Sequence, residues 1–480
     1  MDMRSSQMFS SDSVMQHMTE ATGRNPEGVS AIHSAIQNFS DVEFDEFFEL
    51  NQTISWILDG AYKRIALQFP DELLRYSASI AERIGDGSGA KIFILADTSH
   101  NSCCVDFVAA EHAKADCLVH YGDACLSKLS DCIPVRYVFG CLPVDEIALR
   151  NVLQTYNHQF SANCALLYDT MYSRSAENML GVLSQNFDSQ IVHCRIVDPT
   201  GEVTTSADKI ANALGRQFPV DLFNLSEVTL IFIGDEQSAL LPLWLMTFLN
   251  CTKILSFSPL TSQSSFSHSL MNRQLRKLLF LIERIRDAST LAIVVGTLGT
   301  YAHKEAVERA RELCKKAAKK LYVLSVGKVN VAKLSNFASD IDAFILLSCP
   351  FGVMLDTSEY YRPVVSMFEA EVALNPNKEW AAASGWTAEY GNFISDSIGM
   401  QSDENVDVSL ITGRVRGGRN DVEGDHLNDD SQVALFTAGD YFVNRLWKGL
   451  DDSCSSDEAL LVREGRSGIA SSYVSEPASK

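Results

Sequence analysis

The stretch KIFILADTSHNSCCVDFVAAEHAKADCLVHYGDACLS, residues 91–127, contains a complete strand–helix–strand pattern. Two short apolar runs, KIFILAD (91–97) and CLVHYG (117–122), flank a segment of helical periodicity that begins near Val105. Short apolar strands that alternate with helices predict a parallel sheet covered by helices on both faces. Cysteines follow both strands, at the edge where open α/β sheets place their functional sites.

The same alternation extends in both directions from this stretch. It breaks near residues 160 and 290, which divides the chain into three rounds. We therefore predict an α/β fold of three similar parallel-sheet domains, at residues 41–160, 161–289 and 290–400, around a shared central site. The other predicted strands are KRIALQF (63–69), RYVFG (136–140), CALLYD (164–169), IVHCRIVD (191–198), TLIFIGD (229–235), KILSFSP (253–259), TLAIVVGTL (290–298), KLYVLSVG (320–327) and DAFILLSCP (342–350).

The two ends of the chain differ from its centre in composition. Residues 1–50 hold nine acids and two bases, and residues 401–480 hold fifteen acids and eight bases, so the ends carry most of the net charge of −21. We expect residues 1–40 to be disordered and residues 41–58 to form a lead-in helix. Residues 401–480 should form an acidic linker, one short helix at 438–450 and a disordered tail.

Composition argues against several classes of function. Acids are in excess and Lys and Arg are not clustered, which does not fit binding to nucleic acid or to an anionic membrane surface. No stretch approaches about 18 apolar residues, and the first residues lack the blocks of a secretory signal, so we expect a cytoplasmic protein. The twelve cysteines should then be reduced thiols, and those in special positions favour metal or catalytic roles.

Four cysteines lie at the carboxyl ends of predicted parallel strands. Cys103 and Cys104 follow the first strand of the opening stretch, Cys125 follows the second, and Cys349 ends DAFILLSCP. They are far apart in the sequence, so only a closed arrangement of domains could gather them. Three or four thiolates that meet in one place suit zinc or an iron–sulfur cluster. Cysteine also fills apolar cores, and no Cys-x-x-Cys or ferredoxin-like spacing is present, so both interpretations stay open at this point.

Other motifs give weaker evidence for a functional site. No GxGxxG or phosphate-loop motif follows a strand, and no serine-nucleophile motif is present. GTLGTYAHKE (296–305) places glycines after a strand with the wrong spacing for a phosphate site, so a loop into a helix is the simpler interpretation. His100, His112 and His120 lie near the cysteines as candidate ligands or proton carriers, but each also suits a strand edge. Core filling is the expected role of Cys117, Cys164, Cys194, Cys251 and Cys314.

Two segments together resemble a known family. Residues 97–127 and the block DAFILLSCPFGVMLDTSEYYRPVVSMFEAEVALNPNKEW (342–380) are similar to the family of the two diphthamide synthase subunits, and within it to the second, supporting subunit of eukaryotes. YVFGCLPVD (137–145) and RLWKGLDD (445–452) fit as well. The resemblance spans about residues 45–400 together with that late segment.

The resemblance implies a fold, a reaction and a cofactor. The family has three parallel-sheet domains around a central [4Fe-4S] cluster, which reductively cleaves a carbon–sulfur bond of S-adenosylmethionine. The 3-amino-3-carboxypropyl group is then transferred to a histidine of elongation factor 2. The cluster ligands implied here are Cys104, Cys125 and Cys349, with Cys103 as an adjacent alternative. Three ligands would leave the fourth iron open or bound to water, and the sulfurs of Cys104 and Cys349 should lie within about 7 Å.

The sequence departs from the family pattern in the middle domain. Homodimeric relatives take one cysteine from each domain, but here Gly234-Asp235 stands where Gly-Cys is expected. This departure fits a supporting subunit that assists electron delivery, with S-adenosylmethionine bound at the catalytic subunit. The implied partners are that catalytic subunit in a heterodimer, elongation factor 2 as protein substrate, and an electron-donor protein. The alternative is a non-catalytic scaffold of the same complex without a functional cluster.

Overall fold

The structure is a computed structural model of the 480-residue chain. It describes residues 26–95, 101–129, 133–186, 190–197, 210–269, 271–378, 380, 385–399, 407–413 and 415–416. The expected disorder before residue 26, the helix expected at 438–450, the segment RLWKGLDD, the tail and His100 lie outside the described residues.

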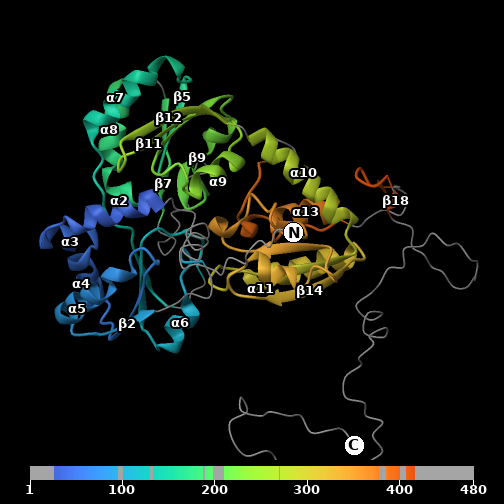
Figure 1. The fold of residues 1–480 in the computed structure, drawn as a ribbon, viewed down its shortest axis with the longest axis horizontal. Helices are drawn as coiled ribbons and strands as arrows, with labels where there is room; N and C mark the ends of the chain where they lie inside the picture. The colour runs from blue at the N-terminus through green and yellow to red at the C-terminus, as the bar shows by residue number, and fades with distance from the viewer. Residues whose placement is uncertain are drawn as a thin grey trace, which may run out of the picture. The chain divides into compact units, whose positions relative to one another are not determined.

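Three sheets organise the described chain, and Figure 1 colours them blue to cyan, green, and gold to orange. Their strands are β1 (Arg64–Gln68), β2 (Lys91–Leu95), β3 (Cys117–Tyr121) and β4 (Val135–Val138); β5 (Asn163–Tyr168), β6 (Gln190–His193), β10 (Val228–Ile233), β11 (Cys251–Ser258) and β12 (Gln263–His268); and β13 (Thr290–Val295), β14 (Lys320–Ser325), β15 (Ala343–Leu347) and β16 (Val364–Ser366).

All three sheets repeat one strand order. The first is β2-β1-β3-β4, the third is β14-β13-β15-β16, and the middle sheet contains β6-β5-β10-β11 with β12 added beside β11. Neighbouring strands are parallel except β11 and β12. Each round of the sequence therefore contributes a sheet of the same topology, and the α/β prediction is confirmed. The domain boundaries near residues 160 and 290 stay a prediction.

Helices connect the strands and cover the sheets. Side-chain caps start several of them: Asp106 accepts a hydrogen bond from the Ala109 amide, Asp145 caps the next helix, and Ser366 forms a capping box with Glu369. None of the described helices is both long and apolar enough to cross a membrane. The helices of the three rounds are α5 (Ser77–Ser88), α6 (Phe107–His112), α7 (Glu146–Tyr156), α8 (Ala176–Asn186), α9 (Leu240–Thr247), α10 (Met271–Asp287), α11 (His303–Lys316), α12 (Val331–Ser335) and α13 (Met367–Leu374).

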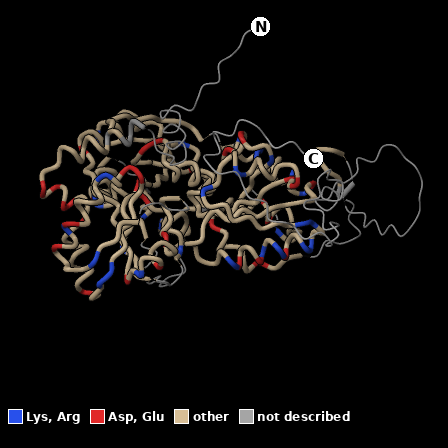
Figure 2. The backbone as a smooth tube through the Cα atoms, turned by 60° about the horizontal axis from the view of Figure 1, so that its bottom comes forward, with Lys and Arg blue, Asp and Glu red and all other residues tan. Residues whose placement is uncertain are grey.

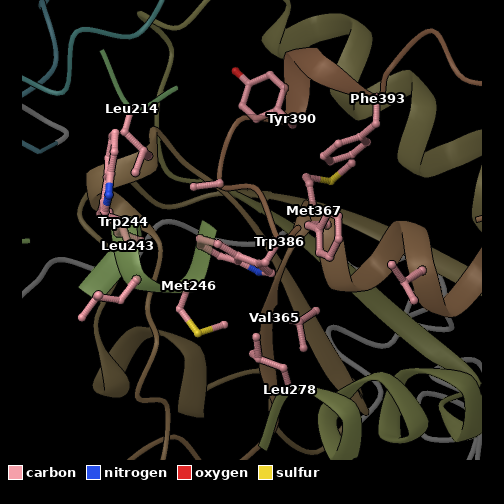
Figure 3. Packing of buried hydrophobic residues seen from close by; sticks show 14 of the residues in the cluster. Leu214, Leu243, Trp244, Met246, Leu278, Val365, Met367, Trp386, Tyr390 and Phe393 are labelled. Atoms are coloured by element: carbon pink, nitrogen blue, oxygen red, sulfur yellow. The ribbon is translucent and has the colours of Figure 1, made fainter. Parts of the chain in front are cut away.

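The middle sheet packs into two cores at once. Successive side chains of a strand point to opposite faces. Leu167 of β5 therefore joins a core shared with Ile293 of the third sheet, whereas its neighbour Leu166 joins a core shared with Val119 of the first. Figure 3 shows the former core, where Trp386 and Phe393 from the segment after the third sheet gather with side chains of α9 and α13. Burial on both faces explains why these strands are continuous apolar runs.

Several local expectations need correction. The single helix expected at 41–58 is two helices, α3 (Asp41–Phe47) and α4 (Leu50–Asp59), because Glu49 adopts a left-handed conformation with φ of 48°. Residues expected to be disordered include helix α2 (Pro26–Gln37), which buries Ile32 and Ile36, one turn apart, in the core of the first sheet. The single strand predicted at IVHCRIVD (191–198) is divided between two sheets, as β6 in the middle sheet and β7 (Arg195–Ile196) in a small antiparallel sheet. The other strands of that small sheet, β9 (Arg216–Pro219) and β8 (Ile210–Ala213), were not predicted.

Charges of both signs are mixed on the described surface. Along α11, Lys and Arg are interspersed with Glu (Figure 2). Arg311 pairs with Glu308, and Lys316 pairs with Glu312 at 3.2 Å. Exposed pairs of this kind add less than about 1 kcal/mol each to stability.

Candidate metal centre

Loops from the first and third sheets bring four cysteines together. The sulfur atoms of Cys103, Cys104, Cys125 and Cys349 all lie within 4.8 Å of one another. Cys103 Sγ is 3.6 Å from Cys349 Sγ, and Cys104 Sγ is 4.0 Å from Cys125 Sγ. Cys349 is 0% exposed, Cys104 and Cys125 are buried, and Cys103 is partly exposed. The expected approach of Cys104 and Cys349 is confirmed; that these residues bind a cluster stays a prediction.

The repeated strand order explains which cysteines meet. Cys125 and Cys349 both follow the third strand of their sheets, β3 and β15. The same place in the middle sheet, after β10, holds Asp235. The Asp235 amide donates to Asp169 Oδ2 at 3.1 Å, and its carboxylate accepts a hydrogen bond from the Gln237 amide at 3.0 Å. Among the described residues, the middle sheet adds no ligand atom to the sulfur group.

Buried polar side chains hold the loop of the tandem cysteines. Gln68 of β1 donates to the Cys104 carbonyl oxygen at 2.7 Å and accepts from the Asp106 amide at 2.9 Å. Its register partner on β3 is His120, whose Nε2 lies 3.0 Å from the Ser102 carbonyl oxygen. A carbonyl only accepts hydrogen bonds, so Nε2 carries the proton. The Cys125 amide donates to the Cys103 carbonyl oxygen at 3.2 Å, which joins the two cysteine loops of the first sheet.

Two buried hydroxyls donate to the sulfurs, and sequence reasoning missed both. Ser127 Oγ donates to Cys125 Sγ at 3.4 Å, and Thr297 Oγ1 donates to Cys104 Sγ at 3.7 Å. Thr297 also lies 3.3 Å from the hydroxyl of Thr300. Thr297 and Thr300 belong to the glycine-containing loop before α11. The sequence did contain one signal for these hydroxyls. Their loop directly follows a predicted strand, as the cysteines do, and therefore lies at the carboxyl end of its sheet.

A hairpin that follows the first two strands of the middle sheet packs against the site without supplying a ligand. The turn between β8 and β9 is formed by Leu214 and Gly215, both with positive φ. A Cβ at Gly215 would lie 2.5 Å from the Cβ of Leu126, which follows Cys125, so only glycine allows this approach. The Leu214 amide donates to Glu389 at 3.0 Å. Burial raises the pKa of the Glu389 carboxyl above its usual value.

The four thiols share protons unequally. Hydrogen bonding with Cys104, Cys125 and Cys349 raises the pKa of the Cys103 thiol well above its usual value, and burial adds to the effect. Hydrogen bonds from Cys103, Cys104 and Cys349 hold the pKa of the Cys125 thiol well below its usual value. Thiolates are the metal-binding form of cysteine, so a bound metal would displace the remaining protons.

The other candidates lie outside the sulfur group. His112 is exposed on α6, and His120 is buried beneath the loop that it holds. Neither supplies a ligand atom to the group among the described residues. Core filling is confirmed for five cysteines in or beside strands and helices, each at most 1% exposed: Cys117, Cys164, Cys194, Cys251 and Cys314.

A small pocket of about 20 Å³ adjoins the site. Its lining includes Cys104, Phe107 and Val108 from the first domain, and Thr297 and Leu298 from the third. Val108 is 46% exposed and Leu298 is 37% exposed, so the rim is apolar and open to solvent. Of the four cysteines, Cys104 lines this pocket.

Comparisons with known proteins identify similar chains. The family model for diphthamide synthesis proteins matches residues 69–385. Curated relatives bear the name 2-(3-amino-3-carboxypropyl)histidine synthase subunit 2. The chain from Caenorhabditis elegans is 44% identical, covering 91% of this chain and 93% of the relative; that from Xenopus laevis is 36% identical, covering 95% and 97%. The relative from Schizosaccharomyces pombe is 34% identical, covering 90% and 91%.

Solved structures show a similar fold. The crystal structure of Dph2 from Pyrococcus horikoshii matches with a TM-score of 0.52 and 18% identity, covering 70% of this chain and 93% of that one. A second crystal structure of the same protein, described as containing a 4Fe-4S cluster, matches with a TM-score of 0.53 and 18% identity, covering 71% and 95%.

Proposed function

The chain belongs to the family of diphthamide synthesis proteins, and from this we propose that it is the supporting iron–sulfur subunit of a 3-amino-3-carboxypropyl transferase. The complete enzyme would transfer that group from S-adenosylmethionine to a histidine of elongation factor 2, the first step of diphthamide biosynthesis. The observation that carries the proposal is the group of four cysteine sulfurs within 4.8 Å. The relatives' name, a synthase subunit 2, supports action within a complex of subunits.

The donor set fits a soft metal centre. All four candidate ligand atoms are sulfurs, and thiolates favour iron–sulfur clusters and zinc over hard cations. The fold neighbour described with a 4Fe-4S cluster supports the cluster. The sulfur separations of 3.6 Å and 4.0 Å also suit zinc, since a tetrahedral ion with bonds of ~2.3 Å has sulfur–sulfur edges of about 3.8 Å. The larger cluster requires the thiolates to move apart.

We propose Cys103 as the fourth ligand, which replaces the open iron position expected from the sequence. Cys103 Sγ lies in the same group and is within 3.6 Å of Cys349 Sγ. Four thiolates would occupy all four irons and leave none free for S-adenosylmethionine. When bound, the cluster would supply single electrons. This chain's own residues would hold the cluster, shield it from solvent and leave one ligand sulfur partly exposed. That arrangement is consistent with a subunit that assists electron delivery.

The proposed partners follow from this role. The catalytic diphthamide synthase subunit would bind S-adenosylmethionine and form a heterodimer with this chain, and elongation factor 2 would be the substrate, in the cytoplasm. An electron-donor protein would supply the electrons. The alternative is a non-catalytic scaffold of the same complex without a functional cluster, whose four thiols hold zinc or no metal. The sulfur separations suit zinc.

Metal analysis of the anaerobically purified chain tests the proposal. We expect about four irons and four sulfides per chain, with iron–sulfur absorbance. Replacing Cys103, Cys104, Cys125 or Cys349 by Ser should remove at least half of the iron without unfolding the chain. Cys314→Ser is the matched control, because Cys314 is a buried cysteine outside the group. One zinc per chain and no iron, or full iron in all four variants, would support the alternative and contradict the proposal.

A further inference from the structure

We propose that Ser127 and Thr297 set the reduction potential of the metal centre by donating hydrogen bonds to its ligand sulfurs. This inference rests on the proposed cluster and concerns residues that bind no metal themselves. Ser127 donates to Cys125 Sγ at 3.4 Å, and Thr297 donates to Cys104 Sγ at 3.7 Å. Sulfur is a weak acceptor, so hydroxyls aimed at two ligand sulfurs indicate a site arranged around thiolates.

Both hydroxyls are withdrawn from water. Ser127 is 8% exposed and Thr297 is 1% exposed, while their acceptors Cys125 and Cys104 are 5% and 7% exposed. A buried hydroxyl is unfavourable unless it has a partner, and each of these hydroxyls has a ligand sulfur within hydrogen-bond distance. In a site of low dielectric constant, the bond to a negatively charged sulfur is also stronger than it would be in water.

The Thr297 hydroxyl has a second polar neighbour besides the sulfur. Thr297 Oγ1 lies 3.3 Å from Thr300 Oγ1. A hydroxyl has one proton to donate. If Thr297 gives its proton to Cys104, it receives one from Thr300, and the two hydroxyls form a chain that ends on the sulfur. Thr297 belongs to the third domain and Cys104 to the first, so this bond forms only when the domains are closed on each other.

Hydrogen bonds to ligand sulfurs favour the reduced state of an iron–sulfur centre. Reduction adds negative charge, and donors that face the sulfurs stabilise it, which raises the reduction potential. A supporting subunit must accept an electron from a donor before passing it on. The two hydroxyls would therefore keep this centre reducible despite its burial. Without them, the same four thiolates would give a centre that is harder to reduce.

A redox titration of the full-length, cluster-loaded chain, followed by electron paramagnetic resonance, tests this role. The variants are Ser127→Ala, Thr297→Val and the double variant. We expect each single change to lower the ratio of reduced to oxidised centre at a fixed solution potential about threefold, and the double change about tenfold, which corresponds to ~59 mV for one electron. Iron content should stay at the wild-type value.

The matched control is Ser348→Ala. Ser348 is buried beside the candidate ligand Cys349, but its hydroxyl donates to the Cys349 carbonyl oxygen rather than to a sulfur. Its potential should equal that of the wild type. Ser127→Thr and Thr297→Ser keep a hydroxyl, so their reduction potentials should equal that of the wild type. This comparison still tests the role of the hydroxyls if Ser127→Ala or Thr297→Val loses iron. Unchanged potentials in the loaded apolar variants, or an equal shift in Ser348→Ala, would overturn the hydroxyl role alone. Absence of iron from the wild-type chain would instead overturn the proposed function.

Discussion

At the scale of single residues, Gln68 is the polar side chain on which the tandem-cysteine loop depends. It lies in β1, which is otherwise apolar after Arg64, and is 1% exposed. Its amide group donates to the Cys104 carbonyl oxygen and accepts from the Asp106 amide, so one side chain fixes the loop on both sides of a candidate ligand. Support of this kind around a metal site orients the ligands that bind directly.

We predict that Gln68→Leu weakens the site without removing a ligand. The change leaves the Cys104 carbonyl and the Asp106 amide without these partners, and each buried group left unsatisfied costs about 1–3 kcal/mol. The thermal midpoint should fall, and a chelator should remove iron several times faster, as followed by loss of cluster absorbance. Gln185→Leu on the surface of α8 is the control, because Gln185 only accepts a hydrogen bond from Arg150. Equal release rates in the two variants would contradict this role for Gln68.

At the scale of elements, an aspartate sets the start of the third strand in two of the sheets. Asp116 precedes β3, and its Oδ2 accepts hydrogen bonds from the amides of Lys63 and Arg64. Asp342 precedes β15 and accepts in the same way from the amides of Ser289 and Thr290. Each carboxylate thereby joins the third strand of its sheet to the first and fixes their register. Cys125 and Cys349 are thus carried to the corresponding edges of their two sheets.

We predict that Asp342→Asn lowers stability by roughly 1 kcal/mol at neutral pH, because hydrogen bonds to a charged acceptor are stronger than those to an amide. Burial opposes ionisation of Asp342, but the hydrogen bonds from Thr290 and Ser289 outweigh it, so its pKa lies below the usual value. The stabilisation is therefore complete above the unfolded pKa of about 3.9 and is lost as pH falls through the folded pKa. Thermal melts of wild type and variant should differ at pH 7 and converge below about pH 4. A difference that stays constant to pH 3 would contradict this.

At the scale of the whole molecule, the middle sheet packs between the first and third sheets, but among the described residues it adds no ligand atom to the sulfur group. One of its faces packs against the core of the first sheet and the other against that of the third. The hairpin turn at Gly215 contacts the residue after Cys125. The place equivalent to Cys125 and Cys349 holds Asp235, whose oxygen is a poor substitute for a soft thiolate.

We predict that the purified full-length chain does not modify elongation factor 2 alone when given reductant and S-adenosylmethionine. Modification should begin when the catalytic subunit is added. With a protein electron donor in limiting amount, Cys349→Ser should slow the complex at least tenfold, whereas Cys314→Ser should match the wild type. Mass spectrometry of the factor measures both results. Efficient modification by the chain alone would refute the supporting role, and an equal rate for both variants would show that this centre is not used.

The sequence by itself determined the strands and the edge at which the site lies. Runs such as TLIFIGD and DAFILLSCP have continuous apolar centres because both faces of their strands are buried, and this local property is visible without a structure. The resemblance carried by DTSEYYRPVV also indicated the family that the comparisons support. Cys103, Cys104, Cys125 and Cys349 were placed at the carboxyl ends of their strands, where α/β sheets carry their sites. The family resemblance then implied Cys104, Cys125 and Cys349 as the ligands.

Only the tertiary structure decided what surrounds those sulfurs. Cys103 lies beside Cys349 across 246 positions, and Thr297 reaches Cys104 across 193. The Leu214 amide reaches Glu389 across 175. No local pattern encodes such pairs, because hydrophobic periodicity reports whether a residue is buried but not which distant loop buries it. The two outer sheets pack against opposite faces of the middle sheet, and this packing decides which distant loops meet. It thereby brings the fourth thiol and the hydroxyl donors to the site.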